Sequence, residues 1–217
     1  CPMVVVAASS PSDCFHYAFM ASKIAMEHMT PVVLLTDGFI ANGSEPWRIP
    51  QMSDYPTITP PVVEPHAEQD FMPYARNEKL ARGWAFPGKK GLEHRIGGLE
   101  KDHLKGTISY DPANHQEMVT TRRRKVELVA DSLPAPEVFG DEKAEVLVVG
   151  WGGTRGHLHS AVRDLQQQGR SIAHLHFNYI YPLPHGVEEV LSRYDRIVVC
   201  ELNEGQFAAY LRQTFPS

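Results

Sequence analysis

The sequence has few of the residues that several classes of protein depend on. Its three cysteines, Cys1, Cys14 and Cys200, lie far apart, so they form neither a CxxC metal knuckle nor a run of iron–sulfur ligands. No stretch approaches the roughly eighteen apolar residues of a membrane span, and no signal peptide is evident. A formal charge of −5 without a long basic run argues against nucleic acid or a membrane as partner. We therefore expect a globular, cytoplasmic protein.

Three local features qualify this picture. The basic cluster RRRK at 122–125 is interpreted as the solvated face of a helix in preference to a phosphate site. Cys200, inside the apolar run RIVVCE, is expected to be a buried small hydrophobe. The chain opens on Cys1 and enters a strand-like run at once, as a cleaved lipoprotein could, but we favour a fragment of a longer protein.

The amino-terminal residues predict a βαβ unit followed by a long irregular arm. The run 3–7 predicts a strand, the capped helical spacing of 9–29 predicts a helix, and the continuous apolar run 30–37 predicts a second strand. Residues 38–110 are rich in proline and glycine, so we expect local hairpins or an arm packed over a neighbouring surface. The expected aromatic anchors of this arm are Trp47, Phe71, Tyr74, Trp84 and Phe86.

The carboxy-terminal half has a more regular pattern. We expect a helix at 111–130 and a short linker at 132–144. The rest predicts three strands, each followed by a helix: strands 145–150, 171–177 and 196–201, and helices 154–168, 181–194 and 206–214. Such alternation is typical of an α/β fold with a parallel sheet covered on both faces, which an additional edge strand from elsewhere can join.

A glycine-rich turn, GWGGTRG, follows the strand at 145–150. Gly150, Gly152 and Gly156 come close to a dinucleotide-binding fingerprint, but Arg155 stands where the third glycine belongs. The acidic residue that should end the next strand is absent from AHLHFNY. We therefore favour glycines that relieve crowding in a strand-to-helix turn, with a nucleotide-binding module as the alternative.

Four histidines lie near this turn in the sequence. His157 and His159 begin a helix, while His174 and His176 point to the same face of a strand. Because no carboxylate or cysteine has a matching spacing, surface or interface histidines are favoured over a metal site. We assign no metal ligand.

Other polar residues of the arm and of the amino-terminal region give little support for catalysis. Glu93, His94 and the run from Glu100 to His103 are interpreted as loop contacts that could help a partner's site. The serines lack a nucleophile-elbow pattern, so acyl-enzyme chemistry has no support. These serines are Ser9, Ser10 and Ser44.

Glu201 ends an apolar strand, where an uncompensated carboxylate is costly. Two interpretations stay open. Glu201 meets amides or a cation while Asn203 or Glu204 caps the next helix, or Glu201 reaches a subunit interface.

Three stretches of the chain resemble a known family. The tail, with AEVLVVGWGGTRGHLHSAVRDLQQQG, HFNYIYPLP and RIVVCELNEGQFAAYLR, resembles the transketolase carboxy-terminal-type domain. The head, SSPSDCFHYAFMASKIAMEHMTPVVLLTDGFIANGSEPW, is similar to the last βαβ unit of a pyrimidine-binding domain. FPGKKGLEHRIGGLEKDH and DPANHQEMVTTRRRKVE are similar to the joining stretch. Over its whole length the chain resembles the alpha subunit of 2-oxoacid:ferredoxin (or flavodoxin) oxidoreductases, with 2-oxoglutarate as the nearest substrate class.

This resemblance implies thiamine diphosphate chemistry. A 2-oxoacid loses carbon dioxide, the acyl group is oxidised onto coenzyme A, and iron–sulfur clusters take the electrons one at a time. It implies thiamine diphosphate, Mg and iron–sulfur clusters in the intact complex, a beta subunit as direct partner, and ferredoxin or flavodoxin as an indirect one. A homodimer is also compatible with it.

The chain lacks the family's recognition motifs. Stretches like YPITP and GPSTG, and the glutamate that contacts the aminopyrimidine ring, have no counterpart, and ITPP at 58–61 stands in the wrong place. The resemblance therefore assigns no catalytic and no cofactor-binding residue here. Gly152, Gly153 and Arg155 are expected to serve turn geometry and subunit contact.

The expected organisation has three parts. Residues 1–43 are the end of a thiamine pyrimidine-binding-type domain, 44–131 a connecting arm and helix, and 132–217 a transketolase carboxy-terminal-like domain. The expected fold is α/β, a parallel doubly wound sheet preceded by a partial βαβ unit and the arm. We expect a carboxy-terminal fragment that supplies scaffold and subunit interface and is inactive alone. The alternatives are a nucleotide-binding module and the tail of another thiamine diphosphate enzyme.

Overall fold

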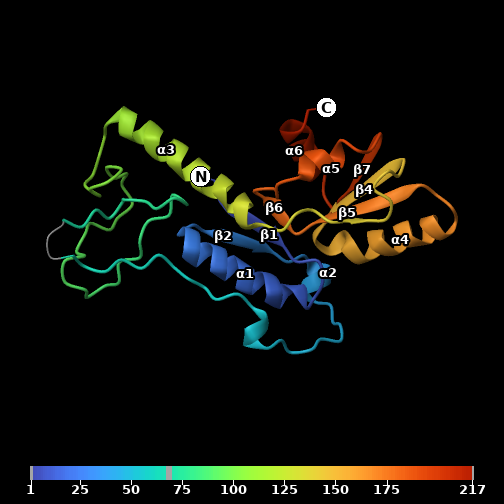
Figure 1. Ribbon diagram of the computed structural model, residues 1–217, viewed down its shortest axis with the longest axis horizontal. Coiled ribbons are helices and arrows are strands. Elements are labelled where there is room, and N and C mark those ends of the chain that lie inside the picture. The colour runs from blue at the N-terminus through green and yellow to red at the C-terminus, as the bar shows by residue number, and fades with distance from the viewer. Residues whose placement is uncertain (1, 67–69, 217) are drawn as a thin grey trace. The chain divides into compact units, whose positions relative to one another are not determined.

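The protein is described by a computed structural model that covers residues 2–66 and 70–216 (Figure 1). Its described residues form two compact units, each assembled from separate stretches of sequence. The arm unit comprises residues 2–4, 21–32 and 50–129, and the sheet unit comprises 5–20, 33–49 and 130–216. In the part of the chain that is described, no helix is both long enough and apolar enough to cross a bilayer.

A three-stranded sheet contains the amino-terminal strands. Its order is β2 (Val32–Leu35), β1 (Val4–Ala7) and β6 (Tyr179–Tyr181), with β6 antiparallel to β1. The helices α1 (Asp13–His28) and α2 (Gly38–Ala41) follow β1 and β2 in the chain. The predicted strand, helix and strand are therefore present. The sequence does not predict β6, because three residues are too few to reveal a period.

A four-stranded sheet forms the centre of the sheet unit. Its order is β3 (Val138–Phe139), β5 (Ile172–Phe177), β4 (Val146–Trp151) and β7 (Arg196–Cys200). β4 is parallel to both β5 and β7, whereas β3 is antiparallel to β5. The expectation of an α/β fold is confirmed, but the sheet is mixed rather than wholly parallel because residues expected in a linker supply β3.

Helices cover both faces of this sheet (Figure 1). They are α4 (Arg155–Gln167), α5 (Val187–Leu191) and α6 (Gln206–Thr214). Leu147 and Leu175 are fully buried and pack in one cluster with Val187 of α5 and Phe207 of α6. α4 covers the other face, where a Cβ on Gly150 would meet Leu158 at 2.4 Å. Because side chains alternate along a strand, the even-numbered residues of β5 point towards α4.

Outside the second half of α1, the arm unit has little regular structure besides α3 (Pro112–Glu127), the short turn η1 (Met52–Asp54) and the start of the turn η2 (Leu128–Ser132). α3 begins where the sequence predicts, because Asp111 accepts the N–H of Ala113 at 3.0 Å and proline follows it. Isolated bridges stand in place of the expected hairpins. They join Val62 to Trp84, Arg76 to Arg82 and Lys101 to Ile108.

Three of the five predicted aromatic anchors are at least half-buried. Trp84 donates from Nε1 to the carbonyl oxygen of Met26 at 2.7 Å, and Phe71 and Tyr74 are partly covered. Trp47 and Phe86 remain 47% and 48% exposed, although the ring of Trp47 contacts that of Phe15, with centroids 5.3 Å apart. Proline-rich sequence marks the arm but does not tell which of its aromatic rings pack.

Candidate functional site

The glycine-rich turn between β4 and α4 is closed by a carboxylate. In the 3₁₀ turn η3 (Gly152–Thr154), the N–H of Gly153 donates to Oδ2 of Asp37 at 2.8 Å. The other oxygen of Asp37 accepts the N–H groups of Phe39 and Ile40, both at 3.0 Å, at the start of α2. An amide that would face a phosphate in a nucleotide-binding turn thus faces an internal anion.

This contact requires glycine at two positions. Gly152 has φ +58°, in the left-handed region that other residues rarely adopt. A Cβ on Gly153 would lie 2.2 Å from Oδ2 of Asp37. Both glycines therefore have the role in turn geometry that the sequence predicts, and the nucleotide-binding alternative loses its phosphate position. Their expected part in subunit contact stays a prediction.

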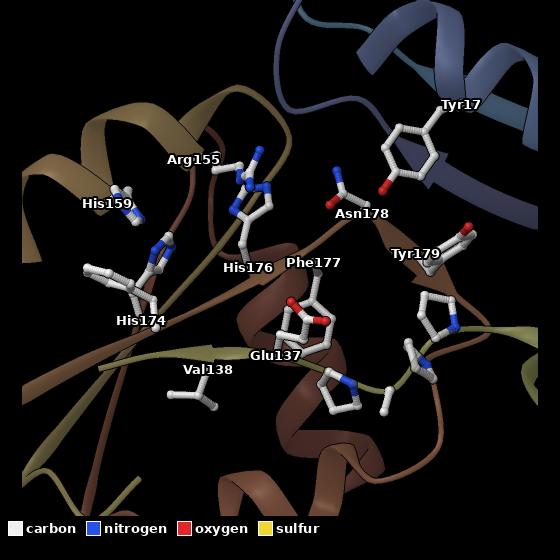
Figure 2. Close-up of a pocket in the computed structure, with 15 residues that line it drawn as sticks. Tyr17, Glu137, Val138, Arg155, His159, His174, His176, Phe177, Asn178 and Tyr179 are labelled. Atoms are coloured by element: carbon white, nitrogen blue, oxygen red, sulfur yellow. The ribbon is translucent and has the colours of Figure 1, made fainter. Parts of the chain in front are cut away.

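A cavity of about 470 Å³ lies within the sheet unit (Figure 2). His174 and His176 of β5 line it from one strand face, and His159 joins them from α4. The ring centroids of His159 and His174 are 6.4 Å apart, and those of His174 and His176 are 5.8 Å apart. Three of the four predicted histidines are thereby brought together. His157 instead contacts the ring of Phe39 at 5.2 Å.

Burial keeps two of these histidines neutral. It lowers the pKa of His174 to about 4, with His159 and Arg155 adding to the effect. It lowers the pKa of His176 to about 3, where the further causes are His174 and Arg155. Neither ring is an imidazolium at neutral pH, so neither can act there as a general acid. Nε2 of His174 and both ring nitrogens of His176 are buried without a hydrogen-bond partner among the described residues.

The remaining polar lining supplies donors and one positive charge. Figure 2 places Arg155 beside His176, with Tyr17 and Tyr179 at the other end of the cavity. Burial raises the pKa of both tyrosine hydroxyls, so they stay protonated. Asn178 donates to the carbonyl oxygen of Ala7 at 2.9 Å. The cavity therefore suits a polar or anionic group, but His174, His176 and the two tyrosines offer no acid or base matched to neutral pH.

The described residues do not fit the cofactor that the resemblance implies. They bring together no three His, Cys, Asp or Glu side chains able to hold a metal ion. A bound diphosphate is held by backbone amides and by Mg²⁺ on carboxylates. The Gly153 amide of the glycine-rich turn is already occupied by Asp37. We therefore assign these residues no chemical step through thiamine diphosphate.

Glu201 has a structural role at the end of β7. Its two oxygens accept the N–H groups of Phe207 and Ala208 at 3.0 and 3.1 Å, so it caps α6 and meets the positive end of the helix. Trp151 also donates to it from Nε1 at 3.4 Å. The expected capping by Asn203 or Glu204 is wrong: the Asn203 side chain accepts only the N–H of Gly205, at 3.3 Å, in the described structure.

The polar residues at 93–103 make the loop contacts that the sequence predicts. Glu93 accepts the N–H of Gly91 at 2.7 Å, and His94 lies 2.9 Å from the carbonyl oxygen of Leu92. Glu100 forms an ion pair with Arg122 at 3.1 Å. These contacts hold the loops within the arm unit, while their help to a partner's site stays a prediction.

The amino-terminal serines and the described cysteines show no reactive arrangement. Ser9 and Ser10 donate to the carboxylates of Asp13 and Glu45, respectively. Cys14 and Cys200 are free and half-buried, so Cys200 is less covered than predicted. Cys1 lies outside the described residues.

The basic cluster at 122–125 is divided between two faces of α3. Arg123 and Arg124 are exposed as predicted, but Arg122 and Lys125 turn inwards and line a second cavity, of about 220 Å³, in the arm unit. The prediction of a wholly solvated face is wrong because four consecutive residues extend around more than a full helical turn. Arg76 and Arg82 line the same cavity. The sequence gives no signal for them, since they come from irregular chain.

The fold matches part of a solved 2-oxoacid oxidoreductase. The solved 2-oxoglutarate:ferredoxin oxidoreductase from Magnetococcus marinus, with 2-oxoglutarate, coenzyme A and succinyl-CoA bound, matches 99% of this chain and 37% of its own. The TM-score is 0.91 and the sequence identity is 25%.

Sequence comparison specifies the family. The family model described as pyruvate flavodoxin/ferredoxin oxidoreductase, thiamine diP-bdg, matches residues 1–109, and the chain belongs to this thiamine diphosphate-binding family. The Mycobacterium tuberculosis 2-oxoglutarate oxidoreductase subunit KorA is 46% identical over 97% of this chain. The Aeropyrum pernix 2-oxoacid:ferredoxin oxidoreductase 1, subunit alpha, is 30% identical over 93% of it. The chain spans only 32% of the length of each of these two relatives.

Proposed function

We propose that this chain is part of the alpha subunit of a 2-oxoacid:ferredoxin oxidoreductase that acts on 2-oxoglutarate. The name of the 46% identical relative and the 2-oxoglutarate in the Magnetococcus marinus structure support this substrate. The intact enzyme oxidatively decarboxylates the 2-oxoacid to an acyl-CoA. Its beta subunit carries thiamine diphosphate, Mg and iron–sulfur clusters, and ferredoxin or flavodoxin receives the electrons. The proposed location is the cytoplasm.

Within that enzyme, the proposed role of these residues is scaffold and subunit interface. The observation that carries this role is the Asp37 carboxylate closing the glycine-rich turn, because it leaves that turn architectural rather than cofactor-binding. The low pKa values of His174 and His176 support the same role, since neither ring is protonated to an imidazolium at neutral pH. Thiamine diphosphate, bound elsewhere in the complex, supplies the carbanion chemistry.

We further propose the division of labour along the chain that the resemblance implies. Residues 1–43 belong to a pyrimidine-binding-type domain, 44–131 form the connecting arm and helix, and 132–217 form a transketolase carboxy-terminal-like domain. The position of the chain as the carboxy-terminal part of a longer subunit stays a prediction, as does a homodimer.

Reconstitution tests the proposed activity. The full-length subunit is co-expressed with its beta subunit, and the reduction of a viologen dye is measured with 2-oxoglutarate, pyruvate or a branched-chain 2-oxoacid, each with and without coenzyme A. We expect coenzyme A-dependent reduction with 2-oxoglutarate as the best substrate, and none from residues 1–217 alone. Turnover by the isolated 217 residues, or a clear preference for another 2-oxoacid, would contradict the proposal.

Calorimetry tests the architectural role separately. Residues 1–217 are titrated with NAD, FAD and ATP, both unchanged and as Asp37→Ala. We expect no saturable heat from the unchanged protein, because the Gly153 amide is occupied. Micromolar binding of any of these nucleotides would favour the nucleotide-binding module instead.

A further inference from the structure

The arm unit contains a cavity of about 220 Å³ that is unusually rich in positive charge. Its polar lining consists of Tyr74, Arg76, Arg82, Thr121, Arg122 and Lys125. We propose that this cavity binds a phosphate group. The inference does not depend on which reaction the intact enzyme catalyses.

The positive charge of the cavity is only partly balanced by the protein, in which the carboxylate of Glu117 also acts favourably on the charge of Arg76. Arg122 is paired with Glu100 at 3.1 Å. Arg76, Arg82 and Lys125 form no ion pair with a carboxylate of the described residues. Like charges held this close in a half-buried site repel one another, and an anion between them removes that cost. Three cations without a carboxylate in ion-pair contact favour a doubly charged ligand over a monocarboxylate.

Neighbouring contacts hold the cations in place before any ligand arrives. The guanidinium of Arg82 lies over the ring of Tyr74, 4.2 Å from its centroid, which fixes its plane and leaves the N–H groups at its edge able to donate. Arg76 donates from Nη1 to the carbonyl oxygens of Tyr74 and His103 at 3.0 and 3.2 Å. Groups fixed in this way lose little conformational freedom when an anion binds.

Lys125 and Thr121 complete the set of donors from α3. Lys125 donates one N–H to the carbonyl oxygen of Met29 at 2.7 Å, which leaves two for a ligand. Thr121 adds a hydroxyl one turn earlier on the same helix. Burial, together with the charges of Arg82, Arg76 and Arg122, lowers the pKa of Lys125 to about 8. The pKa of Lys125 is therefore lowered in part by the positive charges of the neighbouring arginines.

The size of the cavity and its donors favour phosphate over a whole nucleotide. Pockets that enclose a drug-sized ligand measure about 300–1,000 Å³, which is more than this cavity offers. Arginine and lysine together are typical of phosphate sites, where the arginine fork and the ammonium point charge both contact oxygen atoms. The phosphate is either free or the end of a larger molecule, such as a coenzyme A, whose remainder lies outside.

The test uses the full-length subunit in complex with its partner subunit. Binding of inorganic phosphate is measured by calorimetry against chloride at equal ionic strength, for the unchanged protein, Arg82→Gln and Lys125→Gln. Arg123→Gln is the matched control, because it removes one positive charge from an exposed position of the same helix. Arg82→Lys keeps the positive charge, and it replaces Arg82→Gln in the measurement if Arg82→Gln fails to fold.

We expect saturable phosphate binding that weakens about tenfold or more in Arg82→Gln and Lys125→Gln, but not in Arg123→Gln. The affinity of Arg82→Lys for phosphate should be closer to that of the unchanged protein than the affinity of Arg82→Gln is.

A parallel titration with coenzyme A and its dephospho form identifies the source. Loss of affinity only for the larger molecule in Arg82→Gln assigns the site to its phosphate end, whereas loss for inorganic phosphate assigns it to the free ion. Equal affinities of the unchanged and Arg82→Gln proteins for all these ligands overturn the proposal. A loss of subunit association without any loss of anion affinity also overturns it, since an acidic partner segment would then occupy the cavity.

Discussion

The two units of this chain are stabilised in different ways. The sheet unit has a continuous apolar cluster in which strands and helices share side chains such as Leu147, Val187 and Phe207. The arm unit buries apolar side chains such as Leu92, Met118 and Val126 outside that cluster, and single bonds from side chains to carbonyl oxygens connect its loops. Trp84 reaches Met26, and the buried Lys101 reaches Gly97 at 2.7 Å.

This difference decides which parts of the molecule a sequence can reveal. An apolar cluster imposes a period of two or 3.6 residues on every element that joins it. A bond from one side chain to a distant carbonyl imposes no period at all. Substitutions in the sheet unit should therefore affect the unfolding of the whole unit, and substitutions in the arm unit should act locally.

The largest effect is expected at the glycine-rich turn. Gly153→Val places a side chain where Asp37 now lies, and it combines overpacking with loss of a charge-assisted hydrogen bond. We expect a loss of about 3 kcal/mol or more in the free energy of unfolding, measured by urea denaturation. Gly156→Ala is the control, since nothing lies within 4 Å of its Cβ and alanine favours a helix. Equal stability of the two variants would contradict the comparison.

The next effect is a dependence on pH that belongs to the sheet unit. The pKa of His174 is about 4 in the folded protein, against 6.5 as its ordinary value. Between these values the unfolded chain holds a proton that the folded chain does not, so stability falls as the pH falls through this window. His176 extends the effect towards pH 3. The slope is at most about 1.4 kcal/mol per pH unit for each histidine.

Thermal midpoints between pH 7 and pH 4 measure this slope. His174→Gln should flatten it, whatever its effect on stability at pH 7. The exposed His157→Gln should keep the original slope. A slope that His174→Gln leaves unchanged would show that other groups cause the acid sensitivity.

A smaller effect is expected at the cap of α6. Glu201→Ala removes the acceptor of two helix amides, and we expect a loss of about 1–2 kcal/mol in the free energy of unfolding. Hydrogen exchange at Phe207 and Ala208 should accelerate. Glu204→Ala, at an exposed neighbouring position, is the control and should change little. The reverse order of these two variants would restore Glu204 as the cap.

The smallest effect is expected in the arm unit. Trp84→Phe keeps the ring but removes the bond to Met26, at a cost of about 1 kcal/mol. Faster hydrogen exchange should appear at Val63, whose N–H donates to the carbonyl oxygen of Trp84, and leave the four-stranded sheet unchanged. Trp47→Phe is the control because that ring is already exposed. Acceleration throughout the sheet unit would refute local behaviour.

The sequence predicts the long strands and helices well because each carries its own period. β5, α4 and α6 lie within a residue of their expected bounds. Short elements cannot be predicted in this way, because β3 and β6 have only two and three residues, too few for a periodic pattern. Only pairing with their partner strands defines them.

The residues of the candidate sites also differ in whether a local sequence pattern can predict them. The shared face of His174 and His176 follows from strand alternation alone. Asp37 and the cavity with Arg76 and Arg82 depend on contacts between distant positions, which no local pattern encodes. The sequence signal closest to Asp37 is an acidic residue between an apolar strand and a glycine, and that signal predicts a helix cap rather than a partner for the turn.

The bond between Gly153 and Asp37 has a consequence for motif searches. The two residues are 116 positions apart, so a scan that scores the glycines alone does not distinguish sequences with this arrangement from those whose turn amide is open. In this chain the closing carboxylate is that of Asp37, an acidic residue that follows the earlier strand β2. Screening for that companion residue would remove such sequences from lists of presumed dehydrogenases.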